Sequence, residues 1–320
     1  MKQPLSMICT MLVFACPVLG SNPLFFGADP SSLVSQDGRM WIYPTTNEPN
    51  WADQVDWHAW SSSDLVNWTD HGVIFSMQDS GWATKFAWAP DCAYKNGKYY
   101  LYYYFNKGNP GGGVGVAVSD KPEGPFKEAL GHRLVTGHDP SLFVDDGGRA
   151  YLYVQDVAYR LNGDMISLAS DKIDLDIDYR PKPFEAVYVF KRNGIYYYTI
   201  VAEFNRLIYY MGDSPLGPFR YKGESMDKYG GNNHHSVVEY GGKWILWYHG
   251  WVPGHHRRVR GEYLQFNPDG TIQKVKITDE GVGPLTCTGS SQESEKAPVG
   301  RRPAIYVGRE CFEVMDIGTH

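Results

Sequence analysis

One phrase occurs five times along the chain: a turn containing glycine, followed at once by aromatic and β-branched residues. The copies are DGRMWIY at 37–43, NGKYYLY at 96–102, GGRAYLY at 147–153, NGIYYY at 193–198 and GGKWILW at 241–247. Asn-Gly and Gly-Gly supply the positive φ angles of a tight turn between strands, so each copy predicts a β-hairpin.

The marker glycines of these copies, at positions 38, 97, 148, 194 and 242, are 59, 51, 46 and 48 residues apart. Such a period is typical of a four-stranded propeller blade. A second motif supports this period in the later part of blades one, two and four. Ser-Asp at 63–64 leads to Trp68, Ser-Asp at 119–120 leads to Gly-Pro-Phe at 124–126, and Asp-Ser at 213–214 leads to Gly-Pro-Phe at 217–219. No long amphipathic helical pattern interrupts the series. We therefore expect an all-β, five-bladed β-propeller over residues 22–284.

The two ends of the chain differ from the repeats. Lys2 is followed by a mostly apolar stretch from Leu5 to Leu19 and then by small residues, which is the layout of a signal peptide over residues 1–20. Residues 285–320 show no repeat and are expected to form a tail or a truncated accessory module. The protein is therefore predicted to be secreted, extracellular or periplasmic in a bacterium, with no membrane association once the signal is removed. A retained segment would anchor it instead.

Net charge and cysteine spacing argue against two kinds of partner, nucleic acid and a zinc ion. The formal net charge is −6 with no long basic run, so no nucleic acid partner is expected. Beyond the predicted signal the cysteines are Cys92, Cys287 and Cys311, whose spacing matches no zinc site. No cofactor is expected to be required. Asn67 begins an Asn-Trp-Thr sequon, which matters only in a host that glycosylates secreted proteins.

In a propeller the first strand of each blade lines the central channel, and here it precedes the marker turn. The residues nine positions before the five glycines are Asp29, Trp88, Asp139, Glu185 and Asn233. Three of the five are carboxylic acids, and each of these begins an apolar segment. Acids that converge on one pocket raise one another's pKa, so one stays protonated while another ionises. Cleavage of a glycosidic bond needs that combination.

Several short motifs resemble those of family-43 glycoside hydrolases, in the same order over roughly residues 22 to 277. The matching segments are NP at 22–23, ADPS at 28–31, AWAPD at 87–91, HDPS at 138–141, FE at 184–185, KRNG at 191–194, NHHSVV at 233–238 and NPDGTI at 267–272. The resemblance implies inversion of the anomeric centre in one step. It makes Asp29 the general base, Glu185 the general acid, and Asp139 the residue that tunes the pKa of the acid and orients it. In an inverting enzyme the base and the acid stand roughly 6.5–9.5 Å apart.

The resemblance also suggests residues that bind the substrate or an ion. His234 matches an axial histidine that often lies beside a calcium or sodium ion through water; a hydrogen-bonded core histidine, or a register shifted to His235, is the alternative. Arg257 matches an arginine of the pocket, although a solvated basic patch with its neighbours is the other interpretation. Trp88 is expected to contact a sugar ring or to pack in the core. Further candidates for aromatic platforms are Trp57, Trp60, Trp82 and Phe86.

The acid assignment has an alternative. In the family the acid is often followed by Gly-Pro or Ala-Pro, whereas Glu185 is followed by Ala186 and Val187. Glu203, which follows the next predicted strand, is therefore the second candidate.

The expected activity is that of an exo-acting α-L-arabinofuranosidase or β-xylosidase on arabinose- or xylose-containing plant polysaccharides. Endo-arabinanase and galactosidase activities stay open, because the loops at 108–113 and 255–258 are expected to set pocket depth and substrate choice. Alternatives are a fructan-acting propeller hydrolase, a non-catalytic glycan-binding propeller and a protein-interaction scaffold.

Overall fold

A computed structural model describes residues 22–46, 50, 53–105, 112–182, 184–230, 232–254 and 256–285. The predicted signal peptide, Cys287, Cys311, His255 and most of both the 108–113 loop and the 285–320 tail lie outside these residues. Among the residues described, no helix has the length and hydrophobicity needed to cross a membrane.

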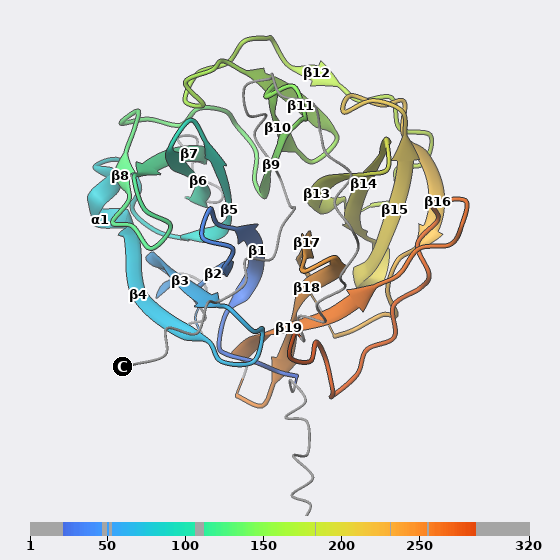
Figure 1. Ribbon diagram of the computed structural model, residues 1–320. Helices are drawn as coiled ribbons and strands as arrows, with labels where there is room; N and C mark the ends of the chain where they lie inside the picture. Colours follow the sequence, from blue (N-terminus) through green and yellow to red (C-terminus); the bar gives the residue numbers. More distant parts are fainter. Residues whose placement is uncertain are drawn as a thin grey trace, which may run out of the picture.

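Five antiparallel sheets are arranged around a central axis like the blades of a propeller (Figure 1). Blade one contains β1 (Ala28–Val34), β2 (Met40–Thr45), β3 (Asp56–Ser62) and β4 (Thr69–Ser76), and blade two contains β5 (Trp88–Lys95), β6 (Lys98–Phe105), β7 (Gly113–Ser119) and β8 (Lys127–Glu128). Blade three contains β9 (Pro140–Val144), β10 (Ala150–Val154), β11 (Val157–Leu161) and β12 (Ile173–Asp174), and blade four contains β13 (Glu185–Arg192), β14 (Ile195–Ala202), β15 (Arg206–Gly212) and β16 (Arg220–Glu224). Blade five contains β17 (His235–Tyr240), β18 (Lys243–Val252) and β19 (His256–Leu264). Among the residues that the structure describes, the short helical segments α1 (Met77–Ser80) and η2 (Glu203–Asn205) lie between strands. The expectation of an all-β, five-bladed propeller is confirmed.

Each marker glycine lies in the turn that joins the first strand of its blade to the second. The φ angles of the five glycines are 78°, 82°, 77°, 83° and 73° in chain order, and a Cβ atom placed on any of them would meet nothing within 4 Å. Glycine is therefore favoured at these turns by the backbone conformation and not by lack of space. Because the turn sits at the same place in every blade, a fixed number of residues counted from it reaches equivalent positions.

The start of the described chain completes blade five, which has only three strands of its own. Residues 24–27 run antiparallel to β19: the Leu24 N–H donates to the Val259 carbonyl (2.8 Å), the Val259 N–H to the Phe25 carbonyl (2.9 Å) and the Gly27 N–H to the Arg257 carbonyl (3.1 Å). The ring is thereby closed by backbone hydrogen bonds between the two ends of the propeller. This closure brings β19 beside the segment that leads directly into β1.

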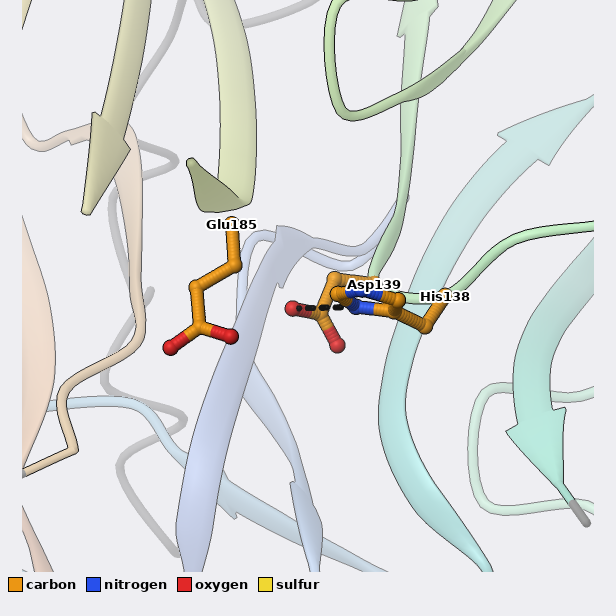
Figure 2. A group of neighbouring side chains, drawn as sticks. All are labelled: His138, Asp139 and Glu185. Carbon is orange, nitrogen blue, oxygen red and sulfur yellow. Dashed lines mark ion pairs between the residues drawn. The ribbon is translucent and has the colours of Figure 1, made fainter. Parts of the chain in front are cut away.

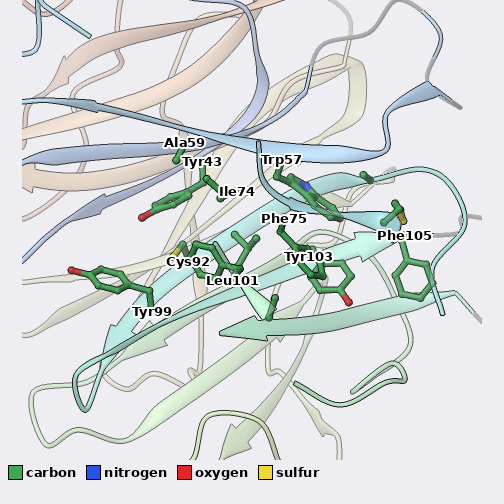
Figure 3. Packing of buried hydrophobic residues seen from close by; sticks show 14 of the residues in the cluster. Tyr43, Trp57, Ala59, Ile74, Phe75, Cys92, Tyr99, Leu101, Tyr103 and Phe105 are labelled. Atoms are coloured by element: carbon green, nitrogen blue, oxygen red, sulfur yellow. The ribbon is translucent and has the colours of Figure 1, made fainter. Parts of the chain in front are cut away.

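The aromatic residues mostly fill the spaces between blades. Figure 3 shows the cluster between blades one and two, in which Trp57 and Phe75 pack against Tyr103 with ring centroids 5.0 and 5.1 Å away. Buried tyrosines also bond backbone carbonyls across blades; the Tyr153 hydroxyl, for example, donates to the Pro215 carbonyl at 2.6 Å. Tyrosine suits this place because its ring buries a large apolar area while its hydroxyl finds a partner.

Asp91 links the inner strands of three blades near the axis. Its carboxylate accepts a hydrogen bond from the Ser31 hydroxyl of β1 (2.5 Å) and one from the Leu142 N–H of β9 (2.6 Å). Burial raises the pKa of Asp91 to about 6, even though these hydrogen bonds oppose the rise. The inner strands that carry the site are thus tied together through a buried side chain.

Candidate active site

A pocket lies on the axis where the inner strands begin, and all five blades contribute to it. Its lining residues are Asp29, Trp88, Ala89, Tyr104, His138, Asp139, Glu185, Asn232, Asn233, His234 and Arg257. All five residues found by counting back from the marker glycines are among them. The predicted convergence of Asp29, Asp139 and Glu185 on one pocket is therefore observed.

One residue at the mouth of each blade has a left-handed backbone. These residues are Asp29, Ala89, Asp139, Ala186 and Asn232, with φ angles of 49°, 38°, 54°, 56° and 50°. In β1, β5 and β13 the strand register also shifts within a few residues of this point, as in a β-bulge. A bulge with a left-handed residue turns a side chain away from the regular alternation of a strand. The repeated distortion thus directs polar side chains toward the axis.

Asp29 is a buried carboxylate with several partners. Its Oδ2 accepts a hydrogen bond from the Thr45 hydroxyl at 2.7 Å, and its Oδ1 lies 3.4 Å from Nη1 of Arg257. Burial by itself would raise the pKa of Asp29, but the charge of Arg257 and the hydrogen bond from Thr45 hold that pKa below its usual value. Asp29 is consequently ionised at neutral pH.

His249 on β18 supports Asp29 as a neutral side chain. Its Nδ1 lies 3.0 Å from the Asp29 backbone nitrogen and accepts that N–H, so the ring proton is on Nε2, which donates to the Asn232 carbonyl at 2.8 Å. Burial is the main reason that the pKa of His249 falls to about 3. The 3.4 Å approach of His249 Nδ1 to Asp29 Oδ1 is therefore no ion pair, and Arg257 is the cation beside Asp29.

Asp139 immediately precedes β9, and Figure 2 shows its carboxylate beside the ring of His138. Its Oδ2 lies 3.1 Å from His138 Nδ1 and accepts the Ala186 N–H at 3.0 Å. Gln155 Nε2 lies 3.3 Å from His138 Nε2, an arrangement that leaves the His138 proton on Nδ1, facing Asp139. Burial opposes ionisation of Asp139, but the hydrogen bonds from His138 and from the Ala186 N–H hold its pKa well below the usual range.

Glu185 is the first residue of β13, and its carboxylate faces that of Asp139 (Figure 2). A Glu185 oxygen, an Asp139 oxygen and a ring nitrogen of His138 all lie within 4.8 Å of one another. These side-chain types also bind metal ions, but His138 already donates to Asp139. Two carboxyl groups so close together do not ionise independently.

The remaining predicted residues separate into two groups. Trp88, Arg257 and His234 line the pocket. His235 does not: its Nε2 lies 2.6 Å from the Thr199 hydroxyl, and burial lowers its pKa well below the usual value, so of the two neighbouring histidines it is His234 that faces the pocket. Glu203, the second candidate for the acid, lies 3.6 Å from Arg206 and is not among the described residues that line the pocket.

The suggested aromatic platforms are mostly core residues. Trp57 is fully buried, Trp60 stacks on Phe25 at 4.2 Å, and Trp82 meets Phe105 edge to face at 3.8 Å. Trp57 is therefore a core residue, and Trp60 and Trp82 are partly buried residues that pack against the core; none of the three is among the described residues that line the pocket. Phe86 instead packs beside Trp88, with ring centroids 5.0 Å apart.

No role was predicted for His138 and Asn232, which line the pocket, nor for four side chains of the second strands, although the repeat contains the signal for these four. Counting seven residues forward from the marker glycines reaches Thr45, Tyr104, Gln155 and His249; the equivalent residue of blade four is Val201. The strand register explains why seven positions forward reaches the site: Thr45, Tyr104 and Val201 pair with Ala28, Trp88 and Glu185, which lie at the start of the first strands. The second strands thus supply the layer that supports the inner ring.

Comparison with known proteins gives a consistent result. Residues 21–282 match the family model of glycosyl hydrolases family 43. The chain is 31% identical to a xylosidase/arabinosidase of Bacteroides ovatus, over 79% of this chain and 96% of that one, and 34% identical to a β-D-galactofuranosidase of Aspergillus niger, over 82% and 86%. Among solved structures, a family-43 β-xylosidase/α-arabinofuranosidase from a compost microbial metagenome, in complex with xylotriose and in a calcium-free form, superposes with a TM-score of 0.73 and 30% identity, covering 81% of this chain and 97% of that one.

Proposed function

The chain belongs to glycosyl hydrolases family 43 and is a glycosidase of the hemicellulose-degrading kind, and from this premise we propose a specific activity and mechanism. The proposed reaction is the single-displacement, inverting hydrolysis of α-L-arabinofuranosyl or β-xylosyl linkages. The observation that carries the proposal is the placement of three carboxyl groups, on three blades, around one pocket.

We assign the general base to Asp29. Arg257 and the Thr45 hydroxyl favour its ionised form, as a base requires. A water molecule attacks the anomeric carbon and loses a proton to the Asp29 carboxylate. The new carbon–oxygen bond forms on the face opposite the leaving group, which inverts the configuration.

We assign the general acid to Glu185, which protonates the glycosidic oxygen as the bond to the anomeric carbon breaks. Asp139, ionised and within 4.8 Å of Glu185, disfavours a second negative charge there and so favours a protonated Glu185 before reaction. His138 and the Ala186 N–H occupy one oxygen of Asp139, which fits an orienting role better than that of a nucleophile.

The pocket wall suits a small sugar. Trp88 and Tyr104 stand with ring centroids 6.1 Å apart and offer apolar surface, while Asn232 and Arg257 offer polar groups for hydroxyls. The family resemblance further implies a structural calcium or sodium ion on the axis. His234 lies within electrostatic reach of Asp29, Asp91 and Asp139, a negatively charged surrounding that suits a cation held by His234 through water. Such an ion would supply positive charge beside these carboxyl groups.

Secretion is part of the proposal and is supported by the apolar segment at residues 5–19. Detection of the processed protein outside the producing cell, or in the periplasm of a bacterium, tests it. A protein that keeps this segment and sediments with membranes would contradict it.

The activity is tested with aryl α-L-arabinofuranosides and aryl β-xylosides, using wild type, Asp29→Asn, Glu185→Gln and the control Glu203→Gln. Loss of about 10²–10⁴ in kcat is expected for the first two variants, and wild-type rates for the control. Glu185→Gln should be less impaired with leaving groups that need little protonation, such as dinitrophenolate. Full activity of Glu185→Gln with loss in Glu203→Gln would overturn the acid assignment. Binding of arabinoxylan without release of any sugar would favour a glycan-binding propeller.

A further inference from the structure

Thr45, the last residue of β2, makes two hydrogen bonds that fix its hydroxyl. The side chain is fully buried, and its oxygen accepts the Ala89 N–H at 2.7 Å while lying 2.7 Å from Asp29 Oδ2. The Ala89 N–H can only donate, so the single hydroxyl proton of Thr45 is free to point to the carboxylate. Because the Ala89 N–H of blade two occupies the Thr45 oxygen as a donor, the Thr45 hydroxyl donates its hydrogen bond to Asp29.

This bond distinguishes the two oxygens of Asp29. Oδ2 is occupied by Thr45, whereas Oδ1 lies 3.4 Å from Arg257 Nη1 and 3.7 Å from His234 Nδ1. Rotation of an aspartate carboxylate about its last torsion is soft, and a contact of 3.4 Å restrains it weakly. The short Thr45 bond is the strongest restraint on that rotation.

We propose that Thr45 is a positioning residue for the reaction: it holds Asp29 Oδ2 so that Oδ1 faces the attacking water and takes its proton. The inference rests on the proposed role of Asp29 as the general base. Thr45 also ties this base on blade one to Ala89, the neighbour of Trp88 on the pocket wall of blade two. It therefore sets the base relative to the wall that receives the sugar.

The chain contains a matched control for this arrangement. Thr278 donates from its hydroxyl to Glu262 Oε2 at 2.9 Å and accepts the Gly281 N–H at 2.9 Å. Thr278 thus lies between a backbone N–H and a carboxylate, as Thr45 does. Thr278 is located where the two ends of the propeller meet, however, and is not among the described residues that line the pocket. Removal of either hydroxyl leaves the same kinds of groups unpaired, so a purely structural role predicts similar effects.

The experiment measures kcat, KM and the melting temperature of wild type, Thr45→Val, Thr45→Ser, Thr278→Val and Asp29→Asn on an aryl glycoside that the wild type hydrolyses. We expect Thr45→Val to lose about 10- to 100-fold in kcat with KM changed less than about 3-fold, because a misplaced base slows the chemical step more than binding. Thr45→Ser keeps the hydroxyl and should stay within about 3-fold of wild type in kcat. Thr278→Val should melt lower but keep the wild-type kcat.

Equal kcat values for Thr45→Val and Thr278→Val would overturn the inference, as would a Thr45→Ser variant as slow as Thr45→Val. If Thr45→Val does not fold, Thr45→Cys replaces it, and its weaker donor should give a kcat between those of the Ser variant and Asp29→Asn. A Thr45→Cys enzyme with wild-type kcat would overturn the inference equally. The proposed function fails separately, through wild-type activity of Asp29→Asn.

Discussion

Replacement of Arg257 by Met removes the cation beside Asp29 while keeping an unbranched side chain of moderate length. Two unit charges 3.4 Å apart interact by about 5 kcal/mol at an effective dielectric constant of about 20, which bounds the effect at roughly 3.6 pH units. Water that enters the vacated space and the remaining Thr45 bond reduce it, and aspartates beside arginine commonly shift by about 1–3 units. Loss of positive charge favours the protonated acid, so the pKa of Asp29 should rise by that amount.

The assay is kcat/KM against pH for wild type, Arg257→Met and Arg257→Lys. A general base must be ionised, so kcat/KM falls as the pH drops through the pKa of Asp29 in the free enzyme. The acidic limb of Arg257→Met should therefore lie about 1–3 pH units higher than that of wild type, whereas Arg257→Lys, which keeps the charge, should move much less. His249 is neutral, and Thr45 and His234 are unchanged, so they do not mask the shift. An acidic limb that does not move in Arg257→Met would refute the assignment of this limb to Asp29.

Three further variants test the fold and the site. Asn22→Ala should lower the free energy of unfolding in urea by about 2–4 kcal/mol, because the amide bonds both the Gly261 N–H and its carbonyl where the ring closes; a change under about 0.5 kcal/mol would contradict this. Gly137→Ala should cost about 2–4 kcal/mol in the same assay, since its φ is +110° and a Cβ would lie 2.4 Å from Val154 Cγ1; unchanged stability would show that the turn adapts. Asp139→Asn should reduce kcat by about 10²–10⁴, most severely for substrates with poor leaving groups, and an equal loss for all leaving groups would argue against a role in tuning the acid.

The blade count and the inner ring of acids were predictable because both depend on local chemistry. Each Asp-Gly, Asn-Gly or Gly-Gly turn selects positive φ by itself, and the turn follows the first strand of each blade, so nine residues back from Gly38, Gly148 and Gly194 reaches equivalent places at the start of that strand. The supporting residues on the second strands lie seven positions after the marker glycines, so they could be predicted from the same repeat by counting forward.

Other features depend on contacts between distant segments. The pairing of residues 24–27 with β19 joins the ends of the propeller, and no local pattern in the sequence indicates it. Trp57 and Trp60 could not be assigned to pocket or core from sequence, because aromatic residues suit both surroundings equally. The ion pair between Arg257 and Asp29 depends on the same closure, because the pairing of residues 24–27 with β19 brings Arg257 beside the start of β1.

The measurement that tests the central claim most directly is the configuration of the sugar first released, followed by ¹H NMR before mutarotation. The account predicts inversion, with Asp29 activating water and Glu185 protonating the leaving oxygen. The oxygens of Asp139 and Glu185 within 4.8 Å are closer than an inverting base and acid, and resemble the roughly 5 Å spacing of a retaining nucleophile and acid. Release of the retained anomer would contradict the account and would make Asp139 the nucleophile.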